Sequence, residues 1–205
     1  MHPFFHGLLF GLWFLVFIGP AFFALLQTSV QRGLKPAIFL AFGVSTSDII
    51  LVLLMLLGLS SWLERPAFKF WIGVFGAITL IVYGIYTWMK PPPKIKELEE
   101  ENGKYLIKYW IKGLVLNGLN PLLILFWVSW VSFASVNYDY SGRQQYQFFA
   151  GLLLTILTTD VLKATFANRY KHNINPKWFR RVNKIVAIIL VGFGLRIVYY
   201  LVQNY

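Results

Sequence analysis

Apolar residues occur along this chain in six long runs, separated by shorter segments that hold most of the charged residues. A helix needs about 20 mostly apolar residues to cross the hydrocarbon core of a bilayer, and each run has about that length. The pattern therefore predicts an all-α integral membrane protein with six transmembrane helices. The predicted spans cover residues 4–27, 36–59, 67–89, 113–135, 147–168 and 182–202.

Two of the six runs are interrupted by a helix-disrupting pair, Gly19-Pro20 in the first and Asn120-Pro121 in the fourth. Proline lacks an amide hydrogen, and its ring leaves the carbonyl four residues earlier without its usual partner. Lipid cannot bond to such groups, so irregular backbone at membrane depth must face protein or a polar cavity. We therefore expect the two pairs to mark a buried solute site.

The basic residues predict the orientation of the spans. Lys and Arg gather in the segments after spans one, three and five, whereas the opposite segments hold only Arg65, Lys69 and Arg143. Cytoplasmic loops carry the excess of positive charge, so both termini are predicted to lie outside. The segment 90–112, with a triple proline and an acidic run, is predicted to be a cytoplasmic linker.

The chain is interpreted as one transmembrane domain, 1–205, made of two halves, 4–89 and 113–202. Because three spans precede the linker, the halves face opposite ways. Each half opens with a proline-broken span and has one aspartate in its second span, Asp48 or Asp160. This arrangement is typical of a 3+3 inverted repeat.

Composition supports a membrane protein and narrows its chemistry. The chain is 58% hydrophobic and only 13% charged, against about 25% charged in soluble domains. The absence of cysteine excludes disulfide and thiolate chemistry. The three histidines, His2, His6 and His172, lie outside the deep parts of the runs, which argues against a histidine path for metals. The net charge of +11 lies in short loops, so it indicates contact with anionic lipid and no nucleic-acid partner.

Asp48, near the middle of the second span, is the first candidate for chemistry. A carboxylate at the bilayer centre costs on the order of 3 kcal/mol on insertion scales, and intramembrane acids are functional by default. Asp48 would bind a substrate ammonium or a coupling proton. Alternatively, it locks helix packing through hydrogen bonds to Ser, Thr or backbone groups.

Asp160 and Lys163 lie three residues apart in the fifth span, so their side chains can meet on one helix face. The pair may be read in two ways that the sequence does not separate. It is either a structural ion pair that makes insertion tolerable, or a transport element in which Asp160 takes a proton or an amine while Lys163 is freed. Lys163 could also bind a substrate carboxylate.

Asn117 and Asn120 supply uncharged donors and acceptors beside the second break. They would coordinate substrate or cap the half-helix that begins at Pro121. Alternatively, they join membrane helices through hydrogen bonds, which is common for Asn. Gly19 and Pro20 would leave a half-helix whose N-terminal amides attract an anion such as a carboxylate. Both breaks lie toward the cytoplasmic side, so they are expected to form an entrance with the aspartates deeper in. Ring residues such as Trp127 are interpreted as interfacial anchors or packing.

The stretch 18–37, followed by Gly43 and Asp48, resembles the first two spans of the lysine exporter (LysE) family, and 113–121 is similar to its fourth span. The resemblance implies amino-acid efflux driven by protons or the membrane potential in a bacterial cytoplasmic membrane. Its motif positions are Gly19, Pro20, Asp48, Asn117, Asn120 and Pro121. The chain departs from the family where Ala21, Phe22 and Phe23 follow the first break and Leu122 follows the second.

The leading interpretation is a secondary exporter of amino acids or similar small zwitterions, with a small-molecule substrate, no cofactor and no enzymatic activity. Enzymes are disfavoured because no span combines a nucleophile with a base and two separated aspartates are a poor metal cluster. Inorganic or metal-ion efflux on a related scaffold and a non-transporting structural protein remain alternatives. The oligomeric state is left open, a homo-oligomer included.

Overall fold

The computed structural model describes residues 2–16, 19–59, 66–89, 103–118, 120–171 and 176–204, and every regular element in these ranges is helical. This confirms an all-α chain. The elements are α1 (Pro3–Gly11), the 3-10 helix η1 (Leu12–Val16), α2 (Pro20–Arg32), α3 (Leu34–Leu54), the π-helix η2 (Met55–Leu59), α5 (Pro66–Met89), α6 (Gly103–Gly118), α7 (Pro121–Tyr138), α8 (Arg143–Arg169) and α9 (Pro176–Asn204).

Proline sets where many of these helices begin. Five of them have proline as their first residue, namely α1, α2, α5, α7 and α9. Proline suits this position because its missing amide hydrogen would have no partner there and its φ angle is already helical. Gly33 separates α2 from α3 with φ of 87°, in the left-handed region that glycine adopts without strain. The prolines of both predicted pairs therefore start helices, as expected.

Both predicted breaks are present. The helical stretches Pro3–Leu15 and Pro20–Arg32 meet at a bend of 73°. At the second break, the Asn120 amide donates to the carbonyl of Asn117 at 3.0 Å, and the Asn120 carbonyl accepts the amides of Leu123 and Ile124. The chain therefore leaves α6 and starts α7 without continuing the helical ladder.

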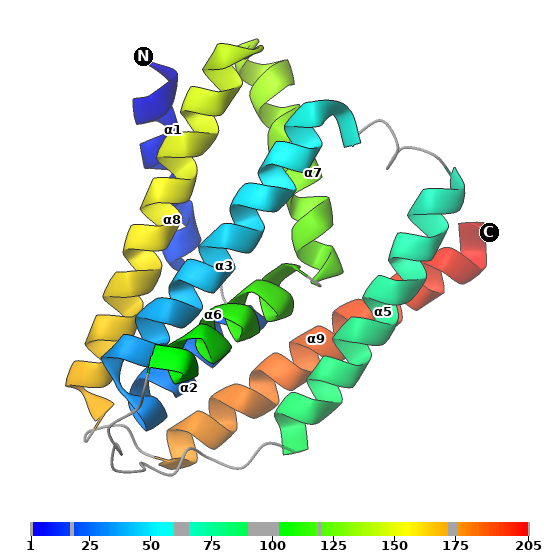
Figure 1. The fold of residues 1–205 in the computed structure, drawn as a ribbon. Coiled ribbons are helices and arrows are strands. Elements are labelled where there is room, and N and C mark those ends of the chain that lie inside the picture. The colour runs from blue at the N-terminus through cyan, green and yellow to red at the C-terminus, as the bar shows by residue number, and fades with distance from the viewer. Residues whose placement is uncertain are drawn as a thin grey trace.

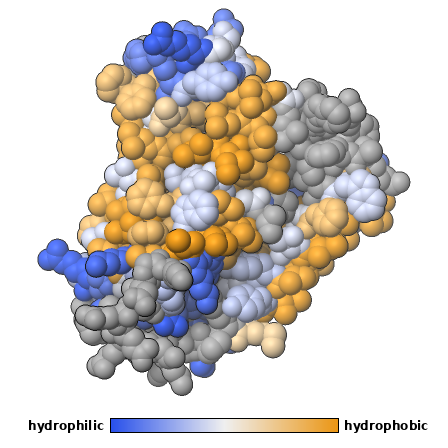
Figure 2. Space-filling view, in the orientation of Figure 1, coloured by the Kyte–Doolittle hydropathy of each residue, from blue (hydrophilic) through white to orange (hydrophobic). Residues whose placement is uncertain are grey.

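Three helices in the described ranges are long and apolar enough to cross a membrane, at Leu34–Gly58, Arg143–Arg169 and Asn183–Asn204. The bent pair around Pro20 adds a fourth if it counts as one span, and α5 has a shorter apolar part, Gly73–Met89. The six-span count stays a prediction, because α6 and α7 are separate shorter helices. Figure 2 shows a broad apolar band between a polar cap and a polar rim on the visible face.

Part of the segment predicted to be a linker is helical, and the linker's boundary at 112 stays a prediction. The helix α6 begins at Gly103, so it includes residues 103–112. Lys108 and Lys112 are four residues apart and share one face, while Tyr109 on another face is buried. Because these lysines lower the local hydropathy, the hydropathy pattern did not indicate this amphipathic helix. The triple proline, the acidic run and His172 lie outside the described residues.

Reciprocal glycine contacts bring α1 against α8. A Cβ added at Gly7 would lie 1.9 Å from the carbonyl oxygen of Phe148, and one at Gly151 would lie 2.1 Å from that of Phe4. Only glycine permits backbones to approach so closely, a common device between membrane helices. Farther along α1, a Cβ at Gly11 would lie 2.5 Å from Cβ of Thr155, so the contacts of Gly7 and Gly11 advance in the same direction along α8 and the two helices run parallel.

The same device joins α3 and α6. A Cβ at Gly43 would lie 2.0 Å from the carbonyl oxygen of Trp110, and one at Gly113 would lie 2.2 Å from that of Leu40. In each of the pairs α1/α8 and α3/α6, the first piece of a broken span from one half packs against the second span of the other half. An inverted repeat would produce such an exchange between the halves. The repeat itself stays a prediction.

Within these contacts the two aspartates occupy different registers. Asp48 follows the contact glycine Gly43 by five residues, whereas Asp160 follows Gly151 by nine. The two carboxylates therefore do not occupy matching positions in the two glycine-joined pairs, although both lie in the second long helix of their half.

The helices α5 and α9 pack side by side along their length, to one side of α1, α3 and α8 (Figure 1). They meet the rest of the molecule through an apolar cluster of Phe23 from α2, Leu80 from α5 and Leu190 from α9. The main core lies elsewhere, around Trp127, Phe148 and Phe149.

Candidate functional site

One small pocket gathers the two helix breaks and both intramembrane aspartates. Its walls come from η1, the start of α2, α3, the end of α6, α7 and α8. The lining residues are Phe14, Gly19, Pro20, Ala21, Phe22, Val44, Asp48, Asn117, Asn120, Leu123, Trp127, Ile156, Asp160 and Lys163. Seven of the eight predicted site residues are among them. The eighth, Pro121, starts α7 next to Asn120.

Asp48 is held on one oxygen by two side-chain donors. Its Oδ1 accepts a hydrogen bond from Nδ2 of Asn117 at 2.8 Å and from Nε1 of Trp127 at 3.1 Å. The residue is only 3% exposed. The network fixes the orientation of the Asp48 carboxylate.

Asn117 connects α6 to α3 at this point. Its Nδ2 lies 2.7 Å from Oγ of Ser47, 2.8 Å from Oδ1 of Asp48 and 3.2 Å from the carbonyl oxygen of Val44. An amide nitrogen has two hydrogens, so three acceptors share two donors. Asn117 therefore joins two helices and also holds the Asp48 carboxylate, while its predicted contact with substrate stays a prediction.

Trp127 is a packing tryptophan, one of the two interpretations given for the ring residues, and it also bonds to the site. It is 1% exposed, stacks beside Phe14 with 6.3 Å between ring centres, and bonds to Asp48. A buried indole needs an acceptor for its N–H. Its position one helical turn beyond Leu123, on the same face of α7 as the second break, was the sequence signal for this role.

Lys163 joins α8 to the first helix break. Its Nζ donates to Oδ1 of Asp160 at 3.0 Å and to the carbonyl oxygen of Phe14 at 3.2 Å. Phe14 belongs to the 3-10 turn η1, just before the break. The ion pair predicted from the spacing is present. The lysine also bonds to the backbone of the interrupted helix. A change in the charge of Asp160 would therefore alter the contact between Lys163 and the bend in span one.

The ionisable groups that line the pocket are two acids and one base. Asp48 and Asp160 contribute two carboxylates to its lining, and Lys163 contributes one ammonium. With all three ionised, the formal balance favours one further cation, either a proton or an ammonium group. The N-termini of α2 and α7 also reach the pocket, through Pro20 and Asn120, and such helix ends favour anions. One small space therefore offers sites for both charges of a zwitterion.

The pocket is contracted. Its volume is about 70 Å³, whereas small-molecule sites usually have ~300–1,000 Å³. A few water molecules would fill this space, and an amino acid would not enter it. The conformation is therefore closed around the polar groups, with the site formed but not open.

A helical membrane protein with two interrupted helices meeting at buried charged groups has the construction of a secondary transporter. The comparisons give the family. The LysE type translocator model matches residues 12–201, so the chain belongs to that family of membrane transport proteins.

Curated relatives align over most of the chain. It is 27% identical over 180 residues to the protein named "Putative amino acid efflux protein YcgF" of Bacillus subtilis, with 86% of each chain covered. It is 26% identical over 189 residues to a leucine efflux protein of Klebsiella pneumoniae, covering 87% of this chain and 86% of the relative. An uncharacterized membrane protein of Pseudomonas aeruginosa is 29% identical over 196 residues, with 87% of each covered. No solved structure matches.

Proposed function

We propose that this protein exports amino acids or similar small zwitterions across the bacterial cytoplasmic membrane. The observation that carries the proposal is the convergence of both broken helices, both intramembrane carboxylates and Lys163 in one pocket. Membership of the LysE type translocator family and the efflux proteins among the relatives support it. The substrate ammonium would pair with Asp48, and its carboxylate would meet the N-termini of α2 and α7.

Asp160 and Lys163 supply a means of coupling. Lys163 pairs with Asp160 and with the Phe14 carbonyl at the bend. A proton on Asp160 would remove the ion pair and leave Lys163 free to turn toward a substrate carboxylate or release the bend. Substrate and proton would then compete for one excess negative charge, which links export to proton movement in the opposite direction.

Transport requires the contracted pocket to open to each side in turn. In the proposed arrangement, six spans form two inverted halves with both termini outside, and the halves rock about the pocket. The parallel pairs α1/α8 and α3/α6 would move as units, because their glycine contacts leave no room for sliding. Rocking between these units would open the space around Asp48 without breaking either pair.

The test uses purified protein in liposomes and a panel of labelled amino acids, with exchange measured at several pH values. We expect exchange of one or more amino acids, dependent on pH and lost in Asp48→Asn. Asp139→Asn is the matched control, because Asp139 is an exposed aspartate in the α7–α8 turn. If no amino acid moves, or if Asp48→Asn preserves both the rate and its pH dependence, the proposal is wrong.

Metal-ion efflux is the second candidate, since a negative pocket also attracts inorganic cations. In the part of the chain that the structure describes, no three His, Asp or Glu side chains are placed to hold one metal ion. The same liposomes loaded with a divalent-cation indicator separate the candidates. Uptake of a divalent cation that depends on Asp48, without amino-acid exchange, would favour the metal.

A further inference from the structure

Three aromatic residues follow one another at four-residue spacing between the N-terminus and the polar pocket. They are His6 and Phe10 of α1 and Phe14 of η1. Residues four apart in a helix share one face, so we call these three the aromatic stripe. Phe14, only 8% exposed, also lines the polar pocket. The stripe therefore leads from the pocket to the end of the molecule that carries the N-terminus and the α7–α8 turn (Figure 1). This end is the polar cap of Figure 2.

Aromatic side chains of α7 close the inner end of the stripe. The ring of Phe14 stacks beside Trp127 with 6.3 Å between ring centres, and it meets Phe126 edge to face at 5.1 Å. Its distance to the Trp130 ring is 5.8 Å. Phe14 therefore fills the space between the pocket and the more distant part of the stripe.

Ring contacts continue from there to the polar cap. Phe10 meets Trp130 edge to face with 5.5 Å between ring centres, and it meets Tyr138 at 5.9 Å. At the end of the stripe, His6 lies edge to face with Tyr138 at 4.5 Å. A hydrogen bond of 2.9 Å joins Nδ1 of His6 to the hydroxyl of Tyr140. Three successive layers of rings thus lie between the pocket and the cap.

The stripe lies on the boundary between two tightly joined parts of the molecule. Gly7 and Gly11 hold α1 against α8, whereas Trp127 ties α7 to α3 through its hydrogen bond to Asp48. Each ring contact between α1 and α7 is weak by itself, so these contacts separate more easily than the glycine-joined backbones. Rocking of the pair α1/α8 against the pair α3/α6 would therefore part the stripe from α7.

Lys163 attaches the inner end of the stripe to the ionisable groups of the pocket. Its Nζ donates to the Phe14 carbonyl at 3.2 Å and lies 5.6 Å from the centre of the Phe22 ring, within the range of a cation–π contact. Phe14 precedes the first helix break and Phe22 follows it, so one ammonium contacts both pieces of the broken span. The ring that closes the pocket toward the cap is thus linked through Lys163 to Asp160.

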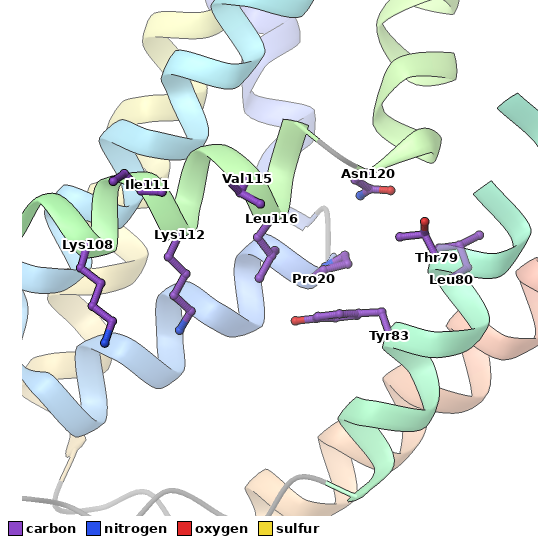
Figure 3. Close-up of a pocket in the computed structure, with 10 residues that line it drawn as sticks. All are labelled: Pro20, Thr79, Leu80, Tyr83, Lys108, Ile111, Lys112, Val115, Leu116 and Asn120. Carbon is purple, nitrogen blue, oxygen red and sulfur yellow. The ribbon is translucent and has the colours of Figure 1, made fainter. Parts of the chain in front are cut away.

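The closure is thinner on another side of the polar pocket. Pro20 and Asn120 line both this pocket and a wider cavity of about 510 Å³ between α5 and α6. Figure 3 shows these two residues at one end of the wider cavity, with Lys108 and Lys112 toward the other. The residues of the breaks are therefore a shared wall, whereas several layers of rings separate the pocket from the cap.

We infer that the aromatic stripe of His6, Phe10 and Phe14 is the gate between the polar pocket and the polar cap, and that the exported solute leaves between α1 and α7 when these rings part. This inference rests on the proposed export function, in which the pocket opens to each side in turn. Phe14 is the innermost gate residue, because it is the member of the stripe that lines the pocket. With the cap on the predicted outer face, the structure has its exit gate closed.

The absence of cysteine from the chain allows a direct test of access. Val44→Cys places one thiol of similar size in the pocket wall, where Val44 is 5% exposed. The experiment measures how fast MTSET, a membrane-impermeant cationic thiol reagent, modifies this thiol in right-side-out and in inverted membrane vesicles. The pocket of about 70 Å³ must open to admit the reagent. A separate Ser141→Cys variant, at an exposed position of the α7–α8 turn, identifies the vesicles that present the cap.

Variants of the stripe are made in the Val44→Cys chain. Phe14→Leu keeps an apolar side chain but removes the ring contacts, and it is expected to raise modification from the cap side about tenfold, without a rise from the opposite side. Phe10→Leu should act in the same direction. Tyr140→Phe removes only the hydrogen bond to His6 and should raise modification from the cap side about threefold.

Phe23→Leu is the matched control. Phe23 is 7% exposed, close to the 8% of Phe14, but it packs in the separate cluster with Leu80 and Leu190. The same change of side chain at this position should leave both rates as they are in the Val44→Cys chain. A rise equal to that of Phe14→Leu would mean that any lost ring loosens the molecule, and the gate would be refuted.

The remaining outcomes separate the inference from the function. An equal rise from both faces in Phe14→Leu, or unchanged modification from the cap side in both Phe14→Leu and Phe10→Leu, would overturn the gate. If Phe14→Leu does not reach the membrane, Phe10→Leu and Tyr140→Phe decide the question. The access assay needs no solute. If the wild-type protein exchanges no amino acid in liposomes, the proposed function fails, while the vesicle rates still decide whether the stripe closes the pocket.

Discussion

Gly43→Ala tests whether the contact between α3 and α6 positions the site. A Cβ at this residue would lie 2.0 Å from the carbonyl oxygen of Trp110, and real Cβ contacts essentially never fall below 3.0 Å. The two helices must therefore separate by about 1 Å. The hydrogen bond from Asn117 to Asp48, now 2.8 Å, would then exceed 3.5 Å and be lost.

Two opposing terms decide the stability of this variant. Alanine is a better helix former than glycine by about 1 kcal/mol. Overpacking of a tight contact costs ~1–3 kcal/mol, and the loss of a hydrogen bond to a charged group costs ~1.5–3 kcal/mol. We expect a net loss of about 2–4 kcal/mol, seen as a lower midpoint of thermal unfolding in detergent, together with loss of exchange in liposomes.

Gly192→Ala is the matched control. Gly192 is also a helical glycine, but a Cβ there would meet no atom within 4 Å. Only helix propensity acts at this position, so the variant should be as stable as the wild type or slightly more stable, with normal exchange. If Gly43→Ala behaves like Gly192→Ala, the close approach of α3 and α6 does not hold the site and the packing argument is refuted.

The remaining predictions concern the polar pocket. Trp127→Phe keeps an aromatic ring beside Phe14 but removes the donor to Asp48; thermal unfolding should show a loss of about 1.5–3 kcal/mol, which should shrink in an Asp48→Asn background, and an equal loss in both backgrounds would contradict the bond. Lys163→Met leaves the partly buried Asp160 without its cation and should cost ~3–5 kcal/mol. Adding Asp160→Asn should restore much of that stability but not exchange, and a double variant as unstable as Lys163→Met would exclude the ion pair as the cause.

The positions of the helix breaks and of most site residues followed from local chemistry. A proline inside an apolar run cannot continue the hydrogen-bonded ladder, so Pro20 and Pro121 start new helices wherever the chain goes. An aspartate or an ion pair in such a run needs a polar environment, so Asp48, Asp160 and Lys163 had to turn inward. These arguments need only the residue and the apolar solvent around it.

The sequence did not predict features whose structural role depends on a neighbouring residue in the fold. The lysines of α6 resembled a soluble linker, because hydropathy does not show that the opposite face of that helix is buried. In the sequence Trp127 resembles any other membrane tryptophan, because its contact with Asp48 arises only when the helices pack. The sequence did not predict which glycines make the close contacts, and so it did not show that Asp48 and Asp160 stand at different distances from them.

By itself, the sequence determined that the chain is helical, that two apolar runs are interrupted and that carboxylates lie within others, because each follows from the cost of unsatisfied polar groups in lipid. Tertiary structure decided that the two interruptions meet at one pocket, that Asn117 and Trp127 hold the same oxygen of Asp48, and that Lys163 bonds to the bend at Phe14. These contacts join residues far apart in the chain. They depend on how closely helices approach, which the glycines permit but which only the packed molecule sets.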